Sequence, residues 1–515
     1  MGALLIGARE ARADQTLTFD GDLVAGGLDH EFIEFDVPAG VKEIQVDHDD
    51  QSADDIIDWG LDDPSGFRGW GGGNGEPAIV GEFAASRSYL ARPILPGKWR
   101  VVVGKAKIVS PAVHYHVVVT LRDAPTLAAQ PERQPYAPTP ALAAGPRWYA
   151  GDLHAHSRES GDADPSIDEL VTFARAEGLD FVELSDHNTV SQLDFIRDTQ
   201  SKHPDILVLP GVEYTTYAGH ANGIGATEWV DHKIGQPGVT IQSAADAFHA
   251  NGALFSINHP LFDLGNLCIG CSWKHDLPAA NVDAVEIVTA ATGDLFGAGT
   301  LAFWDELCAT GKHVAIVGGS DDHSAGQDIG MFGAPVGTPR TFVYAAELSA
   351  KGILEGIQSG RTVVKFHGAS DPMVELTSDV PLDGDTVRAE RTTLRAKITG
   401  GGGTSARWVV NGVPEDSVDV DGDAFELTRE VASAEGKIDR YRVEVLASGL
   451  PATVTSHVWL EFAKGVGADD GGGYHEIAGS GCACAAHGEG DGDASGALVL
   501  VTALGALARS RRRRA

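Results

Sequence analysis

Five short motifs in the middle of the chain combine histidines with carboxylates. Imidazole and carboxylate groups are ligands that suit Zn²⁺, Fe and Mn²⁺, and one carboxylate can bridge two ions. A single such motif is weak evidence, because an isolated histidine is more often an ordinary core or surface residue. Together they predict a metal centre. In chain order the motifs are Asp152-Leu153-His154-Ala155-His156, Ser185-Asp186-His187-Asn188, Gly211-Val212-Glu213 with His220 beyond it, Asn258-His259-Pro260 and Ser320-Asp321-Asp322-His323.

Apolar, strand-like runs accompany these motifs and alternate with helical segments. The runs occupy residues 181–184, 206–209, 254–257, 282–288 and 314–317. Ser166-Ile167-Asp168-Glu169 is a capping box and predicts the start of one helix. The alternation predicts a βα barrel, in which the strand ends converge on one mouth and gather the motifs into one site. Positions two apart on a strand share a face, so His154 and His156 can bind the same ion.

Regions of different character flank this domain. Alternating apolar residues broken by turn-rich segments predict an N-terminal β-sandwich at residues 14–123 and a small immunoglobulin-like β-sandwich at residues 368–463. Residues 124–147 are rich in Pro and Ala, have no periodicity, and predict a linker. The predicted fold class is therefore α/β, with a barrel at residues 148–367 between two sandwiches.

Both ends of the chain carry patterns typical of sorting. The pattern Ala11-Arg12-Ala13 after a short apolar piece predicts that residues 1–13 are the remnant of a secretory signal; a frayed N-terminus is the alternative. Residues 464–515 hold a Gly-rich spacer, an apolar segment and an Arg cluster, and they resemble the C-terminal surface-sorting tails of myxobacteria. That resemblance implies cleavage by a sorting protease near Cys482 or Cys484; a disordered tail is the alternative. We expect an exported protein, at the cell surface or outside the cell, with membrane contact only through the tail.

Composition excludes some classes of protein. The 515 residues carry a net charge of −34, which argues against nucleic-acid binding because phosphate contacts need clustered basic residues. Hydrophobic residues make up 43%, enough for several buried cores. Cys268-Ile-Gly-Cys271 has no second CxxC with which to complete a structural zinc site, so we expect either a local disulfide or two buried thiols.

The ordered set of motifs resembles the polymerase and histidinol phosphatase (PHP) superfamily. The resemblance covers residues 148–367, and flanking segments such as Gly66-Phe67-Arg68-Gly69-Trp70 resemble the CehA/McbA branch of metallohydrolases. It implies a distorted seven-stranded, TIM-like PHP barrel that holds two or three divalent metal ions, either Zn, Mn or Fe.

The same resemblance implies a ligand set for each ion. The chain departs from the family pattern at one position, because Ser160 is followed by Gly161 rather than by Asp, and the spacing favours Asp162 over Asp164 as the acidic ligand there. The implied sets are His154, His156, Glu213 and Asp321 for one ion, Glu213, His220 and His259 for a second, and Asp162, His187 and His323 for a third.

The resemblance implies a metal-dependent hydrolase in which a metal-bridging hydroxide attacks a small-molecule substrate. We expect a phosphoester substrate, with a carbamate or carboxylic ester as one alternative and a non-catalytic surface binding protein as another. The predicted catalytic residues are His187, Asp321, His323 and Asp186, the last as an orienting or proton-transferring group. Arg158 and Lys233 are candidate contacts to a phosphate, with solvated surface charge as the alternative.

Overall fold

The computed structural model describes residues 14–462 except 50, 53, 266–267, 328 and 330–332. These residues belong to one unit of the chain, Met1–Lys464, and the second unit, Gly465–Ala515, lies outside the described part. The predicted signal remnant and sorting tail therefore also lie outside it. Among the described residues, no helix has both the length and the apolar character that crossing a membrane requires.

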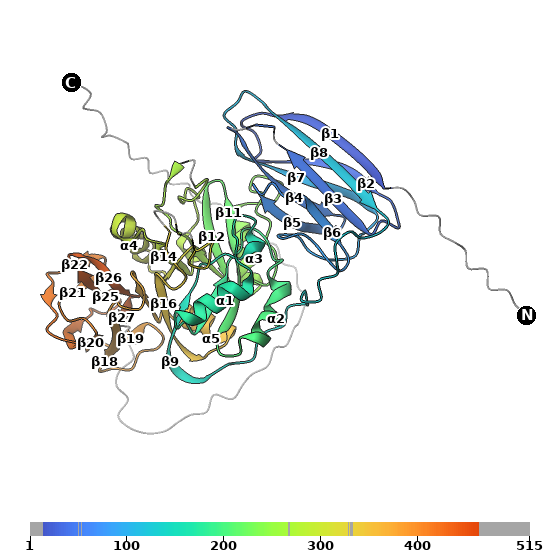
Figure 1. The fold of residues 1–515 in the computed structure, drawn as a ribbon. Coiled ribbons are helices and arrows are strands. Elements are labelled where there is room, and N and C mark those ends of the chain that lie inside the picture. Colours follow the sequence, from blue (N-terminus) through green and yellow to red (C-terminus); the bar gives the residue numbers. More distant parts are fainter. Residues whose placement is uncertain are drawn as a thin grey trace, which may run out of the picture. The chain divides into compact units, whose positions relative to one another are not determined.

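Two four-stranded antiparallel sheets form the N-terminal domain, drawn in blue in Figure 1. Their strand orders are β1-β8-β3-β6 and β2-β7-β4-β5. Ile44 and Val119 of the first sheet meet Phe35 and Trp99 of the second in one core, as expected when alternate residues of each strand face inward. The strands are β1 (Gln15–Leu23), β2 (His30–Val37), β3 (Glu43–Asp49), β4 (Ile56–Asp63), β5 (Gly66–Gly72), β6 (Ala78–Gly81), β7 (Gly97–Lys107) and β8 (Val113–Arg122).

A mixed sheet with helices packed against it forms the central domain (Figure 1). The capping box is confirmed, because Ser166 and Glu169 exchange both of its hydrogen bonds at the start of α1. The elements are β9 (Ala144–Asp152), η1 (Arg158–Ser160), α1 (Ile167–Ala176), β10 (Phe181–Leu184), α2 (Leu193–Lys202), β11 (Leu207–Thr216), β12 (Gly219–Ile224), α3 (Ile241–Ala250), β13 (Leu254–Ile257), η3 (Ala279–Asn281), β14 (Ala284–Thr289), α4 (Gly293–Ala309), β15 (Ala315–Gly319), β16 (Arg340–Glu347), α5 (Ala350–Gln358) and β17 (Thr362–Lys365).

The central sheet departs from simple strand–helix alternation. Its order is β15-β14-β13-β12-β11-β10-β9-β16-β17. β9, β10 and β11 run parallel, as do β13, β14 and β15, but β12 is antiparallel to both of its neighbours. The reason is that only Tyr217 and Ala218 join β11 to β12, and so short a turn cannot make a parallel crossover. The segments after β15 and after β9 also meet, since the amide of Asp321 donates to the carbonyl of His154 at 2.8 Å. This contact shows that the sheet is curled.

The C-terminal domain is built of strands and continues the central sheet. β26 pairs with β17 and leads through β25 to β21 and β22. A separate three-stranded sheet, β18-β20-β24, contributes Leu394 to a core that it shares with Trp408 and Val443. The strands are β18 (Met373–Ser378), β19 (Thr386–Arg388), β20 (Arg391–Thr399), β21 (Ser405–Val410), β22 (Val413–Pro414), β23 (Val418–Asp419), β24 (Ala424–Ala432), β25 (Ile438–Ala447), β26 (Leu450–Thr455) and β27 (Val458–Glu461).

Candidate metal centre

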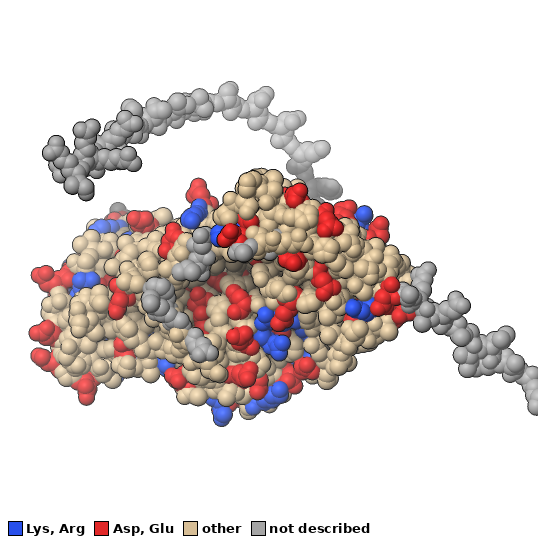
Figure 2. Space-filling view, turned by 45° about the horizontal axis from the view of Figure 1, so that its top comes forward, with Lys and Arg blue, Asp and Glu red and all other residues tan. Residues whose placement is uncertain are grey.

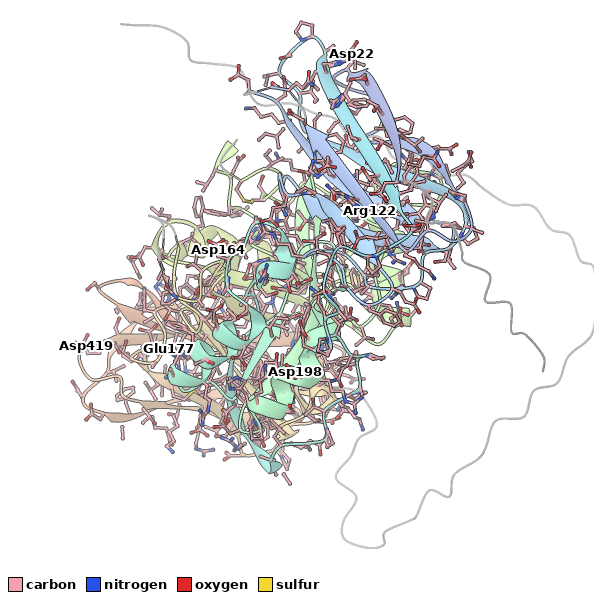
Figure 3. The ribbon with its side chains drawn as sticks, turned by 45° about the vertical axis from the view of Figure 1, so that its right-hand side comes forward. Asp22, Arg122, Asp164, Glu177, Asp198 and Asp419 are labelled. Carbon is pink, nitrogen blue, oxygen red and sulfur yellow. A yellow bond between two sulfur atoms is a disulfide. The ribbon has the colours of Figure 1, made fainter. Side chains whose placement is uncertain are left out.

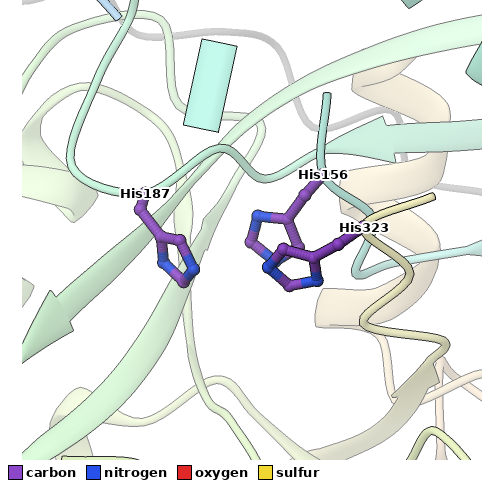
Figure 4. Close-up of side chains that lie close together, drawn as sticks. All are labelled: His156, His187 and His323. Carbon is purple, nitrogen blue, oxygen red and sulfur yellow. The ribbon is translucent and has the colours of Figure 1, made fainter. Parts of the chain in front are cut away.

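The five motifs meet at one end of the central sheet. Figure 4 shows three imidazoles, those of His156, His187 and His323, that approach one another from separate segments. The ring centroid of His156 lies 4.1 Å from that of His323 and 4.5 Å from that of His187. The predicted ligands follow β9 (His154, His156), follow β10 (His187), lie on β11 and β12 (Glu213, His220), follow β13 (His259) and follow β15 (Asp321, His323).

A first group of ligand atoms comes from His154, His156, Glu213 and Asp321. These atoms lie within 4.8 Å of one another. The Asp321 Oδ1 atom is 3.2 Å from His154 Nε2 and 3.1 Å from His156 Nε2, and Glu213 Oε1 is 3.3 Å from His154 Nε2. The geometry therefore brings together two imidazoles and two carboxylates around one point.

Glu213 also faces a second pair of imidazoles. Its Oε1 atom lies 3.3 Å from His220 Nδ1 and 3.3 Å from His259 Nε2. Burial opposes the charge of this carboxyl, but the imidazoles of His154, His187 and His220 hold the pKa of Glu213 well below its usual range. Glu213 is thus a buried carboxylate placed to bridge two ions.

A third group opens toward solvent. The ligand nitrogens of His156, His187 and His323 lie within 4.8 Å of one another, and Asp162 Oδ2 is 3.3 Å from His187 Nε2 and 3.6 Å from His323 Nε2. The side chains of His187 and His323 are 18% and 32% exposed, against 1% for His154. Asp164, labelled in Figure 3, is exposed, and its backbone amide donates to the carbonyl of His323. The structure therefore places Asp162 in the group, and Asp164 beside it.

One ring nitrogen of each of the six imidazoles forms a hydrogen bond with an oxygen atom outside the ligand groups or with a backbone carbonyl. A carbonyl can only accept, so it fixes the tautomer of the ring that donates to it. The other nitrogen of each ring then faces the carboxylates of the centre. The bonded pairs are His154 Nδ1 and Glu286 (3.0 Å), His156 Nδ1 and Ser160 Oγ (3.0 Å), His187 Nδ1 and Thr215 Oγ1 (2.6 Å), His220 Nε2 and Ile269 O (3.3 Å), His259 Nδ1 and Cys271 O (3.1 Å), and His323 Nδ1 and Asp321 O (2.9 Å).

Two buried polar atoms at the centre, His154 Nε2 and Glu213 Oε2, make no hydrogen bond of acceptable geometry with the described residues. His154 Nε2 nevertheless lies 3.2 Å from Asp321 Oδ1, and Glu213 Oε2 lies 2.8 Å from His187 Nδ1, so both face groups of the centre. A buried polar atom without a partner costs about 1–3 kcal/mol, so native structures rarely leave one unpaired without a reason. A metal ion would satisfy both atoms, and the set of imidazoles and carboxylates suits Zn²⁺, Mn²⁺ or Fe. The residues present therefore fit a divalent metal.

Sequence reasoning missed Glu286, which lies on β14. Its carboxylate accepts from His154 Nδ1 at 3.0 Å and from the backbone amide of His259 at 2.9 Å. Such carboxylate partners orient the ligand histidine and raise its basicity. The signal available in the sequence was a carboxylate within the apolar run 282–288. The structure shows that this carboxylate is buried.

Backbone conformation at two ligands is also unusual. His259 has φ of 28° and Asp321 has φ of 53°, in the left-handed region that residues with a side chain seldom adopt. Each residue is the second one after the end of a strand, where this conformation turns the side chain out of the strand's alternation. Strained backbone of this kind concentrates at functional sites.

Three predicted functional residues do not contact the ligand groups in the structure. Asp186 accepts hydrogen bonds from the backbone amide and hydroxyl of Ser157, the residue after His156, which suits an orienting role; burial raises its pKa to about 8. Arg158 is exposed and lines a groove that none of the predicted ligands lines. Lys233 is buried, with its Nζ 2.8 Å from Asp231 Oδ1 and 4.5 Å from the Trp229 ring.

The N-terminal domain reaches the solvent-facing side of the centre. Tyr217 Oη donates to Asp58 Oδ2 of β4 at 2.7 Å. Burial raises the pKa of Asp58 to about 6, and the charges of Asp162 and His187 also act on it. A Cβ on Gly161, next to Asp162, would lie 2.6 Å from the carbonyl oxygen of Gly71 in the sandwich. The sandwich therefore packs directly beside the third ligand group.

Comparison with known proteins gives distant similarities. No family model matches the chain, and no curated protein does. A solved two-domain protein from Bacteroides vulgatus, described as containing a predicted PHP-like metal-dependent phosphoesterase, is similar at 20% identity over 64% of this chain and 100% of that chain, with a TM-score of 0.36. A CARDB domain from Pyrococcus furiosus in complex with di-metal ions is similar at 18% identity over 18% of this chain and 88% of that chain, with a TM-score of 0.14. The fold and the site themselves define a mixed α/β protein with a candidate divalent-metal centre.

Proposed function

We propose that the protein is an exported metal-dependent hydrolase of the PHP type, related to the CehA/McbA branch, and that it cleaves a phosphoester. The observation that carries the proposal is the orientation of the six imidazoles. Each gives one nitrogen to an oxygen and directs the other toward Glu213, Asp321 or Asp162. This arrangement is typical of metal ligands. Bound divalent ions would activate water as the nucleophile and neutralise charge that develops on the substrate.

The residues of the chain have distinct tasks in this proposal. Glu213 holds the first two ligand groups together, because it lies 3.3 Å from imidazoles of both. His187, His323 and Asp162 form the side from which a substrate enters, since they are the exposed part of the centre. Asp186 keeps the loop after β9 in place through Ser157.

A phosphoester is favoured by the charge of the site. The three groups hold three carboxylates and six imidazoles, and imidazoles bind metals in their neutral form. Three divalent ions would leave the centre positive even when Glu286 and one hydroxide are counted, which suits an anionic substrate. Acidic side chains are spread over the face drawn in Figure 2, and the chain carries a net charge of −34. The attraction of an anionic substrate must therefore come from the metal centre itself.

Export and cleavage of the C-terminal tail are part of the proposal. The disulfide between Cys268 and Cys271 supports export, because such bonds persist in oxidising compartments. Mass spectrometry of the secreted protein would test it. We expect a C-terminus near Cys482 or Cys484, and full-length protein retained in the cytoplasm would contradict the proposal.

The test of activity combines metal analysis with a panel of substrates. We expect metal-loaded protein to hydrolyse an aryl phosphate, a chelator to abolish the activity, and Glu213→Gln to remove both metal and activity, while Glu177→Gln at the exposed end of α1 retains both. The panel also holds an aryl carboxylic ester and an aryl carbamate. Cleavage of these alone would show that the phosphoester assignment is wrong. Folded protein that binds no metal and cleaves none of these substrates would favour the alternative of a non-catalytic binding protein.

A further inference from the structure

Two adjacent residues of the N-terminal sandwich, Arg87 and Ser88, are hydrogen-bonded to the loop after β9. They lie between β6 and β7, and the loop carries Asp162 of the third ligand group. The backbone amide of Ser88 donates to Glu159 Oε2 at 3.1 Å, and Arg87 Nη1 donates to the carbonyl of Ala163 at 3.1 Å. One contact comes before Asp162 in the sequence and the other directly after it. The sandwich thus holds the loop on both sides of this ligand.

The same segment is also hydrogen-bonded to the loop after β10. The carbonyl of Ser88 accepts from Thr189 Oγ1 at 3.1 Å, and Thr189 lies two residues after His187. Ser88 is fully buried and has φ of 71°, in the left-handed region that is unfavourable for a residue with a side chain. With this backbone, a single residue of the sandwich donates to one loop of the third group and accepts from the other.

A further contact joins the sandwich to the hairpin of β11 and β12. Tyr217 Oη, in the turn of the hairpin, donates to Asp58 Oδ2 of β4 at 2.7 Å. Two residues before Tyr217, the hydroxyl of Thr215 lies 2.6 Å from His187 Nδ1. A Cβ on Gly104 of β7 would lie 2.3 Å from Tyr217 Oη, so the sandwich fits closely around this hydroxyl. The hairpin that orients the His187 ring is therefore bonded to the sandwich as well.

The rings of the second ligand group are held in a different way. His220 and His259 are hydrogen-bonded to the carbonyls of Ile269 and Cys271. Both of these carbonyls belong to the central domain itself. The third group differs, because its ligands lie on loops that are bonded to another domain.

We infer that the N-terminal sandwich assembles the third metal position, with Arg87, Ser88 and Asp58 as positioning residues. The inference rests on the metal centre of the proposed function, and it adds that the sandwich sets how many ions the centre holds. While the sandwich keeps the loops in place, Asp162 Oδ2 and His187 Nε2 lie 3.3 Å apart and can share an ion. Coupling between two sites is reciprocal, so an ion bound there must also hold the sandwich more tightly.

Zinc titration of the full chain tests the inference. Bound Zn²⁺ is counted by elemental mass spectrometry over a range of buffered free Zn²⁺ concentrations, so that each position fills in turn. We expect three steps in the wild type, and the step that is missing from Asp162→Asn identifies the third position. Arg87→Ala is expected to lower the affinity of that position about tenfold, the lower end of the loss that follows removal of an outer partner of a metal ligand. The other two steps are expected to stay unchanged.

Matched variants separate this positioning role from a general loss of stability. Thr189→Val removes the hydroxyl that donates to Ser88 and is expected to act as Arg87→Ala does, whereas Thr189→Ser keeps the hydroxyl and the affinity. Arg100→Ala is the control in the sandwich, because Arg100 pairs with Asp62 of the same domain. It is expected to leave all three steps unchanged.

Hydrogen exchange gives the reverse test without a substitution. Exchange of the Ser88 amide is followed by mass spectrometry at free Zn²⁺ concentrations that fill two positions or all three. Since the coupling is reciprocal, we expect exchange about tenfold slower when the third ion is bound. Asp162→Asn is expected to keep the faster rate at every Zn²⁺ concentration.

The outcomes distinguish this inference from the proposed function. A wild type that binds only two ions, or Arg87→Ala protein with equal losses at all positions or with none, would overturn the role of the sandwich alone. Exchange of the Ser88 amide that does not respond to the third ion would overturn it as well. Protein that binds no Zn²⁺ would overturn the metal centre and the role of the sandwich together.

Discussion

Replacing Glu286 by Gln tests whether a buried carboxylate on β14 orients the metal ligands. The substitution keeps the size of the side chain but removes its charge. Glu286 accepts from His154 Nδ1 at 3.0 Å and from the amide of His259 at 2.9 Å. A Gln that keeps its oxygen toward His259 presents an amide NH₂ group to His154, where two donors would meet. His154 is then driven to the tautomer that protonates Nε2, the atom that faces Asp321 and Glu213.

The size of the effect follows from the lost hydrogen bond. A hydrogen bond to a charged group contributes about 1.5–3 kcal/mol. Loss of an outer partner of a metal-binding histidine typically lowers metal affinity about 10- to 100-fold, which corresponds to about 1.4–2.7 kcal/mol. The two figures agree, so we expect Glu286→Gln to lower the affinity for the most tightly bound ion by one to two orders of magnitude.

The assay is competition for Zn²⁺ with a chelating indicator at fixed neutral pH. Glu183→Gln is the matched control, since Glu183 is a buried carboxyl on β10 of the same sheet whose oxygens have no hydrogen-bond partner among the described residues. Replacing Glu183 therefore removes no hydrogen bond to a ligand histidine, and metal affinity is expected to stay unchanged. Wild-type affinity in folded Glu286→Gln would refute the reasoning.

Three further predictions concern the edge of the centre and its packing. Asp162→Asn is expected to lower the number of bound ions by one while Asp164→Asn leaves it unchanged, as measured by elemental mass spectrometry; equal losses would contradict the assignment. Gly161→Ala is expected to lower the melting temperature, at a cost of about 1–3 kcal/mol, because φ is +89° and the carbonyl of Gly71 fills the space; an unchanged melting temperature would argue against this contact. His232→Phe is expected to reduce the loss of stability between about pH 7 and about pH 5 in urea unfolding. Burial holds the pKa of His232 well below its usual range, so below about pH 6.5 only the unfolded chain takes up a proton there, and stability falls with pH. A wild-type pH slope in the variant would show that His232 does not contribute.

The central fold was predictable to the extent that local sequence determines structure. The helix α1 begins at Ser166 because the capping box satisfies its first amides locally. The turn between β11 and β12 was not recognised, although its two residues leave room only for an antiparallel hairpin. The predicted alternation of strand and helix failed there because periodicity indicates a strand but not the direction of its neighbour.

The candidate metal ligands can be named from the sequence by itself, because ligand chemistry is a property of residue type and the motifs lie at strand ends. The tertiary structure alone decides how each ring is oriented. Glu286 comes from a distant strand, and Ile269 and Cys271 act through backbone carbonyls that have no signature in residue type. Similarly, spacing favoured Asp162 over Asp164, but a side chain's direction depends on the backbone around it, and only the folded chain places the Asp162 carboxylate 3.3 Å from His187.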